Sequence, residues 1–307
     1  MMISHLRFIS RLTRLLFVSL AIVLPLSPGR ALEGPQPEIV SIPARAAGSD
    51  WKVHTQVFKP EGPGPFPLVV FSHGRAGKPE ERQSLEYPVL RGHVTYWMRK
   101  GFAVVAPIRP GYGVTGGADL EASTIGINKQ GVCTGSPLFE QAVGNAADVV
   151  SEVVAWARRQ AWVNNTKIVL VGQSVGGMTT VAAGARALPG VIAYINFAGG
   201  HGGNPDRRPG KSCFPETLTS LYGAYGRTTR IPNLWLYASN DQYWGPDMPQ
   251  LWHDAFARAG GQGRFIKTGP VPGEDGHKLL SKGGRLWGDH VDPFMDSLGF
   301  KTLVGRR

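Results

Sequence analysis

A serine stands between small residues where an apolar run gives way to a helical pattern. The residues Gly-Gln-Ser-Val-Gly occupy positions 172–176, directly after the apolar run 168–171. Small flanking residues permit the tight, strained turn that lifts a serine hydroxyl clear of a sheet. The helix that follows points its unpaired N–H groups toward developing negative charge. This context predicts that Ser174 is a nucleophile for acyl chemistry.

A serine hydroxyl is a weak nucleophile and needs a histidine base that a carboxylate orients. Asp241 follows the apolar run 234–237, and His277 lies in a Gly-flanked loop after the extended segment 265–267. Loops that follow the carboxyl ends of parallel strands meet at one edge of the sheet. We therefore predict that Ser174, Asp241 and His277 form a catalytic triad in that chain order.

Other acids and histidines are weaker candidates for these roles. Asp247 is an alternative acid, but it lies deeper in its loop. Asp206 precedes the strand and fits the chain order poorly, and His290 falls within a predicted C-terminal helix. Asp275 is expected to be structural or to face solvent.

Backbone N–H groups usually hold the oxyanion of a tetrahedral intermediate. The amide of Val175, directly after the nucleophile, is one predicted donor. The second should come from the loop after the strand 68–71, where we select the amide of Arg75. His73 is expected to shape this loop by packing and hydrogen bonding.

Two Gly-rich segments are expected to run above the sheet as loop excursions, over residues 109–137 and 199–230. They are predicted to build the roof of the substrate pocket. His201, in the second excursion, is a candidate pocket residue, although a surface position fits it equally well. Trp244 is a further candidate pocket residue.

Buried apolar runs alternate with helical patterns along the chain. This alternation predicts an α/β fold with a mostly parallel sheet covered by helices on both faces. The predicted strands are 52–58, 68–71, 102–106, 167–171, 191–197, 234–237 and 265–267, and the predicted helices are 89–100, 139–161, 176–187, 249–259 and 285–298.

The N-terminal segment 1–31 has the pattern of a secretory signal peptide, with arginines, an apolar core and small residues near its end. Its apolar core of about a dozen residues falls short of the roughly 20 needed to cross a bilayer. An uncleaved membrane anchor is the alternative. Export to the periplasm or the medium is therefore expected, and no later segment is apolar enough to span a membrane.

The rest of the chain is predicted to be a flexible lead-in over 32–50 and one domain over 51–307, since 42% of the 307 residues are hydrophobic. The formal net charge of +11 falls to +7 without the four arginines of 1–31, and the excess is dispersed. Nucleic-acid binders concentrate positive charge, so we predict no nucleic-acid partner. Nothing in the sequence indicates an oligomeric state.

The chain has two cysteines, Cys133 and Cys213, and they lack the paired spacing of a zinc site. In an oxidising compartment two such thiols often join. A bridge between them would close a loop of about 80 residues. Two free buried thiols are the alternative. No metal and no cofactor are expected.

Taken together, the motifs resemble those of α/β-hydrolases of the dienelactone-hydrolase and prolyl-oligopeptidase-like group. The resemblance covers about residues 53–298 and implies a sheet of eight strands, no cofactor, and hydrolysis of esters, lactones or peptides through an acyl-enzyme. Serine departs from true dienelactone hydrolases, whose usual nucleophile is cysteine. Tyr112 matches a loop tyrosine of the group, which implies either a substrate contact or packing. The residues that carry the resemblance are 73–75, 109–113, 172–177, Asp241 and His277.

The leading functional hypothesis is a serine hydrolase that cleaves carboxylic esters, with a small ester or acyl compound as substrate. A peptidase or an acyltransferase could use the same three residues. A non-catalytic binding protein on a hydrolase fold is the alternative from another class. Such relatives usually lose the nucleophile, the acid or the histidine, whereas all three candidates are present here.

Overall fold

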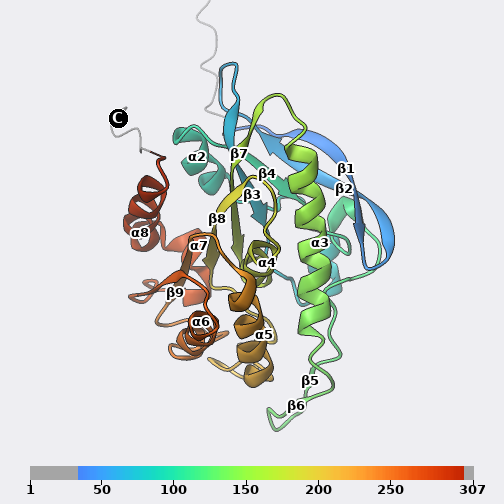
Figure 1. Ribbon diagram of the computed structural model, residues 1–307. Coiled ribbons are helices and arrows are strands. Elements are labelled where there is room, and N and C mark those ends of the chain that lie inside the picture. The colour runs from blue at the N-terminus through green and yellow to red at the C-terminus, as the bar shows by residue number, and fades with distance from the viewer. Residues whose placement is uncertain (1–33, 301–307) are drawn as a thin grey trace, which may run out of the picture. The chain divides into compact units, whose positions relative to one another are not determined.

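The continuous apolar runs form the middle of an eight-stranded sheet (Figure 1). A computed structural model describes residues 34–300 of the chain, so the predicted signal peptide over 1–31 lies outside the described residues. The strand order is β1-β2-β4-β3-β7-β8-β9-β10. The bounds are β1 Glu38–Ala46, β2 Ser49–Phe58, β3 Phe66–Ser72, β4 Ala103–Pro107, β7 Val163–Gln173, β8 Val191–Phe197, β9 Asn233–Ala238 and β10 Gly263–Thr268.

The sheet is parallel from β4 to β10, and β2 runs antiparallel to both β1 and β4. In the middle of the sheet, Ser72 pairs with Gly172 and Gly172 pairs with Asn196. The carboxyl ends of β3, β7 and β8 therefore lie side by side. This register brings the loops that follow these strands to one edge of the sheet.

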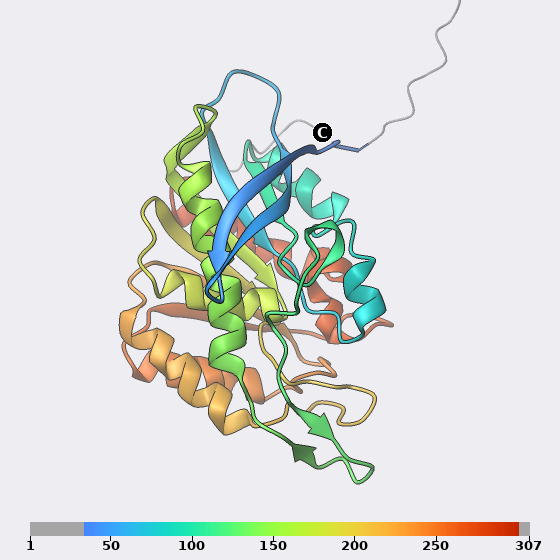
Figure 2. The ribbon, with the colours of Figure 1, turned by 90° about the vertical axis from the view of Figure 1, so that its right-hand side faces the viewer.

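Helices cover both faces of the sheet, as the alternation of apolar runs and helical patterns predicts. Side chains of β3 alternate between two cores: Leu68 and Val70 pack with α3, α4, α5 and α6, while Val69 and Phe71 pack with α2, α7 and α8. Figure 1 shows α3 on one side of the sheet and α2 and α8 on the other, and Figure 2 gives the view at right angles. The helices are α1 Pro79–Gln83, α2 Arg91–Arg99, α3 Phe139–Ala157, α4 Val175–Gly184, α5 Pro215–Thr228, α6 Met248–Arg258, α7 Leu279–Lys282 and α8 Gly284–Ser297.

The predicted flexible lead-in over 32–50 is wrong for most of its length, because residues 38–46 form the edge strand β1. Ile42, Ala44 and Ala46 are buried on one face of this strand, and the residues between them face outward. Alanine is a weak strand former, so the alternation gives little signal in the sequence. Pairing with β2 along its whole length stabilises β1. The domain therefore begins before residue 51.

The two predicted loop excursions contain regular structure. The first holds the 3-10 helix η1 (Gly113–Thr115) and a short hairpin of β5 (Gly126–Ile127) and β6 (Cys133–Thr134). The second is a loop only up to residue 214, because α5 occupies most of the remainder. Two signals in the sequence could have revealed α5. One is a proline in the first turn, Pro215, and the other is an apolar stripe formed by the buried Leu218, Leu221 and Tyr222.

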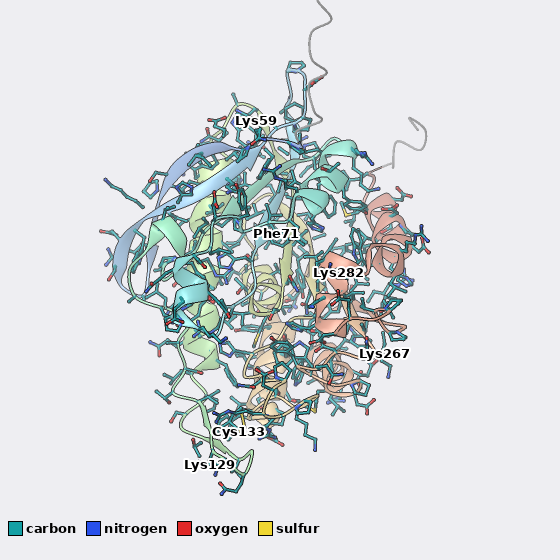
Figure 3. The ribbon with its side chains drawn as sticks, turned by 180° about the vertical axis from the view of Figure 1, so that it is seen from behind. Lys59, Phe71, Lys129, Cys133, Lys267 and Lys282 are labelled. Atoms are coloured by element: carbon teal, nitrogen blue, oxygen red, sulfur yellow. A yellow bond between two sulfur atoms is a disulfide. The ribbon has the colours of Figure 1, made fainter. Side chains whose placement is uncertain are left out.

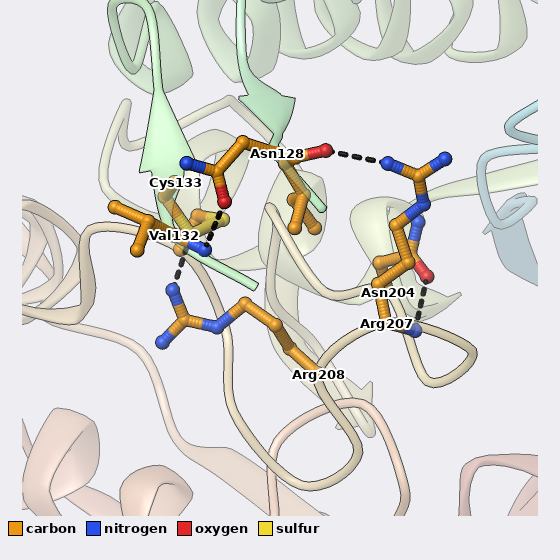
Figure 4. Close-up of a disulfide and its surroundings, with 8 residues drawn as sticks. Asn128, Val132, Cys133, Asn204, Arg207 and Arg208 are labelled. Carbon is orange, nitrogen blue, oxygen red and sulfur yellow. Dashed lines mark hydrogen bonds between the residues drawn. A yellow bond between two sulfur atoms is a disulfide. The ribbon is translucent and has the colours of Figure 1, made fainter. Parts of the chain in front are cut away.

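Cys133 and Cys213 form the predicted disulfide, and their Cα atoms lie 5.7 Å apart. In Figure 3, Cys133 and Lys129 lie at the lower end of the view, on the hairpin β5–β6. Figure 4 shows two arginines of the neighbouring loop that reach this hairpin: Arg208 contacts the sulfur of Cys133, and Arg207 donates to the carbonyl of residue 127. The bridge and these contacts tie the two excursions together.

Over residues 34–300, none of the helices is both long enough and apolar enough to cross a membrane.

Replacement of both cysteines by serine is expected to lower the free energy of unfolding by about 4 kcal/mol, because the bridge closes a long loop. Urea unfolding of the double variant and of the oxidised wild type, followed by circular dichroism, measures this difference. Reduced wild type is the matched control and should unfold like the double variant. Equal stability of oxidised and reduced wild type would contradict the prediction.

Candidate active site

Ser174 occupies a strained turn between β7 and α4. Its φ of 57° lies in the left-handed region, which costs a non-glycine residue on the order of 1 kcal/mol. Glycine is required on both sides of the serine. A Cβ on Gly172 would lie 2.2 Å from the carbonyl oxygen of Gly176, and a Cβ on Gly176 would lie 2.1 Å from that of Ser72. The sequence Gly-x-Ser-x-Gly is therefore what this packing permits.

The structure brings Ser174, His277 and Asp241 together in one hydrogen-bonded line. His277 Nε2 lies 3.0 Å from Ser174 Oγ, and His277 Nδ1 lies 3.1 Å from Asp241 Oδ2. The other carboxylate oxygen of Asp241 accepts from the amides of Tyr243 and Trp244, at 2.8 and 3.1 Å. With Nδ1 donating to the carboxylate, Nε2 is free to accept the serine proton.

Asp275 joins the loop that carries the acid to the loop that carries the histidine. Its Oδ1 accepts from the amide of His277 and from the amide of Gln242, both at 2.9 Å. Next to it, a Cβ on Gly276 would lie 2.5 Å from the amide nitrogen of Asp241. Of the two roles expected for Asp275, structural and solvent-facing, the geometry gives the structural one. It fixes the backbone of His277, which lies in the 3-10 helix η2 (Gly276–Lys278).

Two aromatic residues enclose the imidazole of His277. The ring of Tyr243 stacks on it at 3.9 Å between centroids with an angle of 24°, and Trp244 presents an edge at 5.4 Å. Trp244 is buried, and its indole N–H donates to the carbonyl of Ala198. Sequence reasoning proposed Trp244 for the pocket but missed Tyr243. Its position two residues after the acid was the available signal.

The segment that contains the second predicted oxyanion donor borders the nucleophile. A Cβ on Gly74 would lie 3.4 Å from Ser174 Cβ, so the chain passes directly beside the serine. Arg75 follows Gly74 in this segment, and Val175 opens α4 on the other side of the serine. Val175 is thus the chain neighbour of Ser174, and Arg75 is the chain neighbour of the glycine that passes beside it.

A buried group of charges in the first excursion supports this segment. Arg109 and Glu121 form an ion pair with side chains only 2% and 1% exposed. Arg109 also donates through Nη1 to the carbonyl of His73 at 2.8 Å. Tyr112 is buried and its hydroxyl donates to Glu121 at 3.0 Å, so it packs inside the protein.

Asp119 holds the side chain of Arg75. Both terminal nitrogens of Arg75 donate to this carboxylate at 2.7 Å, and Arg82 Nε lies 3.3 Å from it. A bidentate pair of this kind restrains orientation as well as distance. The pair with Asp119 therefore restrains Arg75 through its side chain. Two residues earlier, Arg109 restrains His73 by a hydrogen bond to its carbonyl.

The histidines near the serine other than His277 are neutral at physiological pH. Burial lowers the pKa of His73 to about 3 and that of His201 to about 4. His201 packs on Phe139 and is only 4% exposed. His201 is therefore a buried packing residue, and His277 is the imidazole that faces the serine.

The weaker candidates from the sequence lie elsewhere. Asp247 precedes α6 with 84% of its side chain exposed, and its carboxylate lies 3.7 Å from Lys267 Nζ. His290 lies within α8, and Asp206 is exposed in the loop before α5. Over residues 34–300, no group of three His, Cys, Asp or Glu side chains is placed to hold a metal ion.

The sheet order and the serine turn, with its His and Asp partners, define the class of α/β-hydrolase folds. The chain belongs to the alpha/beta hydrolase family, whose profile matches residues 69–301. No curated protein matches the chain by sequence.

Solved structures of three enzymes are similar to this fold. A *Pyrococcus furiosus* esterase has 11% identity and a TM-score of 0.57, covering 86% of this chain and 91% of its own. A putative dienelactone hydrolase from *Klebsiella pneumoniae* has 15% identity and a TM-score of 0.53, covering 85% and 99%. A *Mycobacterium tuberculosis* puromycin-hydrolysing peptidase has 16% identity and a TM-score of 0.57, covering 87% of this chain but 41% of its own. At these identities the likeness concerns the fold.

The buried neutral histidines are expected to make stability fall as the pH drops. Burial lowers the pKa of His73 and of His93, in α2, to about 3, and that of His201 to about 4. Each takes up a proton on unfolding below its ordinary pKa of about 6.5. Near pH 5, three such protons give a slope of about 4 kcal/mol per pH unit in the free energy of unfolding.

Urea unfolding between pH 4.5 and 7 measures this slope. His93→Gln should lower it by one such proton, because glutamine takes up no proton in this range. A pH-independent stability over this range would rule out neutral buried histidines.

Proposed function

We propose that this protein is a serine hydrolase that cleaves carboxylic esters through an acyl-enzyme. The observation that carries the proposal is the hydrogen-bonded line from Asp241 through His277 to Ser174. A nucleophile in contact with a base that is itself oriented by a carboxylate is the arrangement that acyl transfer requires.

In the proposed first half-reaction, Ser174 Oγ attacks the ester carbonyl carbon while His277 Nε2 accepts the serine proton. Asp241 stabilises the imidazolium that forms, and the stacked ring of Tyr243 presents its face to the same cation. The amides of Val175 and Arg75 are the proposed donors to the oxyanion. One such donor is typically worth about 10²- to 10³-fold in kcat.

The intermediate then collapses as the carbon–oxygen bond to the leaving alcohol breaks. His277 Nε2 gives its proton to the departing oxygen, and an acyl group remains on Ser174. In the second half-reaction a water molecule takes the place of the alcohol, and His277 again accepts a proton. Release of the acid returns the proton to Ser174 Oγ.

A peptidase would use the same residues, and the similarity to a puromycin-hydrolysing peptidase is the observation that favours it. An amine is a poorer leaving group than an alcohol, so the ester reaction demands less of the site. Aminoacyl 4-nitroanilides are the direct test of the peptidase. An acyltransferase would be recognised by transfer to an added alcohol in preference to water.

We further propose that the chain is exported and that residues 1–31 are removed. The disulfide supports this proposal, because such bridges persist in oxidising compartments. Intact mass measurement of the protein recovered from the periplasm or the medium would show the loss of this segment.

Ser174→Ala is expected to lower kcat on 4-nitrophenyl butyrate by at least about 10⁴-fold, because it removes the nucleophile. Asp241→Asn should also cause a loss of about 10⁴-fold, since it disturbs the tautomer of His277. Asp289→Asn, the same change at an exposed aspartate of α8, is the matched control. Unchanged thermal melting of each variant excludes misfolding.

Unchanged hydrolysis by Ser174→Ala would refute the assignment of the nucleophile. A larger loss in Asp247→Asn than in Asp241→Asn would contradict the assignment of the acid.

A further inference from the structure

A cavity of about 420 Å³ lies between the loop before α5 and the loop before α6. Its volume is within the range of pockets that hold small molecules. Most of its exposed lining is apolar. The apolar side chains of this lining are Pro215, Trp244, Pro246 and Met248.

Two cations line the same cavity without a carboxylate partner. Within residues 34–300, neither Arg208 nor Lys211 forms an ion pair, and the guanidinium of Arg208 contacts the sulfur of Cys133. Asp247 also lines the cavity, but Lys267 outside it lies 3.7 Å away. The lining therefore has an excess of positive charge beside an apolar surface.

Ser212 adds an unused hydrogen-bond donor to this wall. The residue is 2% exposed, and its hydroxyl has no partner within the described residues. Ser212 is also a residue of the cavity lining, so its hydroxyl is a candidate donor to a bound acceptor. A buried hydroxyl without a partner is costly, and an acceptor from a ligand would remove that cost.

The wall that bears these groups is held rigidly. Gly203 and Ser212 pair across the base of the loop, and the next residue is bridged to Cys133. Gly210 donates to the carbonyl of Gln242 at 2.6 Å. A wall that is already in place does not have to be ordered when a ligand binds.

Trp244 connects the cavity to the active site. Its indole lines the cavity and also lies 5.4 Å from the imidazole of His277, between ring centroids. Trp244 is therefore a residue shared by the cavity lining and the surroundings of the base.

We propose that this cavity is a substrate subsite for an apolar group that ends in a carboxylate. The apolar walls receive the hydrocarbon part, and Lys211, Arg208 and the Ser212 hydroxyl receive the carboxylate, which is purely an acceptor. The inference rests on the proposed ester hydrolysis, since it names the class of substrate for that site. It accounts for the unpaired cations and the unpaired hydroxyl together.

Binding is tested with 4-phenylbutyrate and with its neutral analogue 4-phenylbutanamide, by calorimetry on the folded protein. The carboxylate is expected to bind at least about tenfold more tightly at low salt, and added NaCl should shrink this preference because exposed charges are screened. Lys211→Glu should abolish the preference, because it places a like charge at the carboxylate. Lys52→Glu, the same charge change in β2, is the matched control and should retain it.

A kinetic experiment then connects the cavity to the reaction. 4-Phenylbutyrate should inhibit hydrolysis of 4-nitrophenyl butyrate competitively. Binding without competition would overturn the subsite, and equal binding of acid and amide would overturn the carboxylate specificity. If the wild type hydrolyses no ester, the proposed function fails, while the calorimetric comparison still reports on the cavity.

Discussion

The position of Ser174 depends on the close approach of three stretches of backbone around it. A side chain larger than hydrogen at Gly172 or Gly176 would collide with the carbonyls of Gly176 or Ser72. This contact packs α4 against the ends of β7 and β3 and forces the serine into its left-handed conformation. The position of the hydroxyl is therefore set by backbone packing, and the rest of the site is arranged around it.

Hydrogen bonds and a buried ion pair support the segments around the serine. Asp275 accepts hydrogen bonds from both loops that meet at the edge of the sheet, so the acid and the histidine keep their spacing. On the other side, Arg109 and Glu121 place a compensated ion pair beneath the segment that carries Arg75. Removal of one member of such a buried pair leaves an unpaired charge, which is strongly destabilising.

The central strands and the triad could be predicted because their signals are local. The run 191–197 is apolar apart from Asn196 and becomes β8 with the same bounds. Ser174, Asp241 and His277 each follow a strand-like segment, so their convergence follows from the parallel sheet. β1 was missed because its buried face is partly alanine and its stability comes from pairing with β2.

The supporting residues were harder to predict because their roles depend on which loops meet. Tyr243 faces His277 only because the loops after β9 and β10 converge, and its position two residues after the acid does not by itself show that contact. The family resemblance of Tyr112 allowed either a substrate contact or a packing role. Its hydrogen bond to the buried Glu121 favours packing. The local sequence pattern identifies residues that could take part in the chemistry. The residues that surround them depend on tertiary contacts, which a local pattern does not contain.

The disulfide divides the proposed triad between two parts of the chain. The covalent ring from Cys133 to Cys213 contains Ser174, whereas Asp241 and His277 lie after it. In a polypeptide delivered with its N-terminus first, the ring can therefore close before the acid and the base have emerged. The proposed nucleophile then has neither of its proposed partners until the last quarter of the chain arrives, so the proposed triad is completed late in biogenesis.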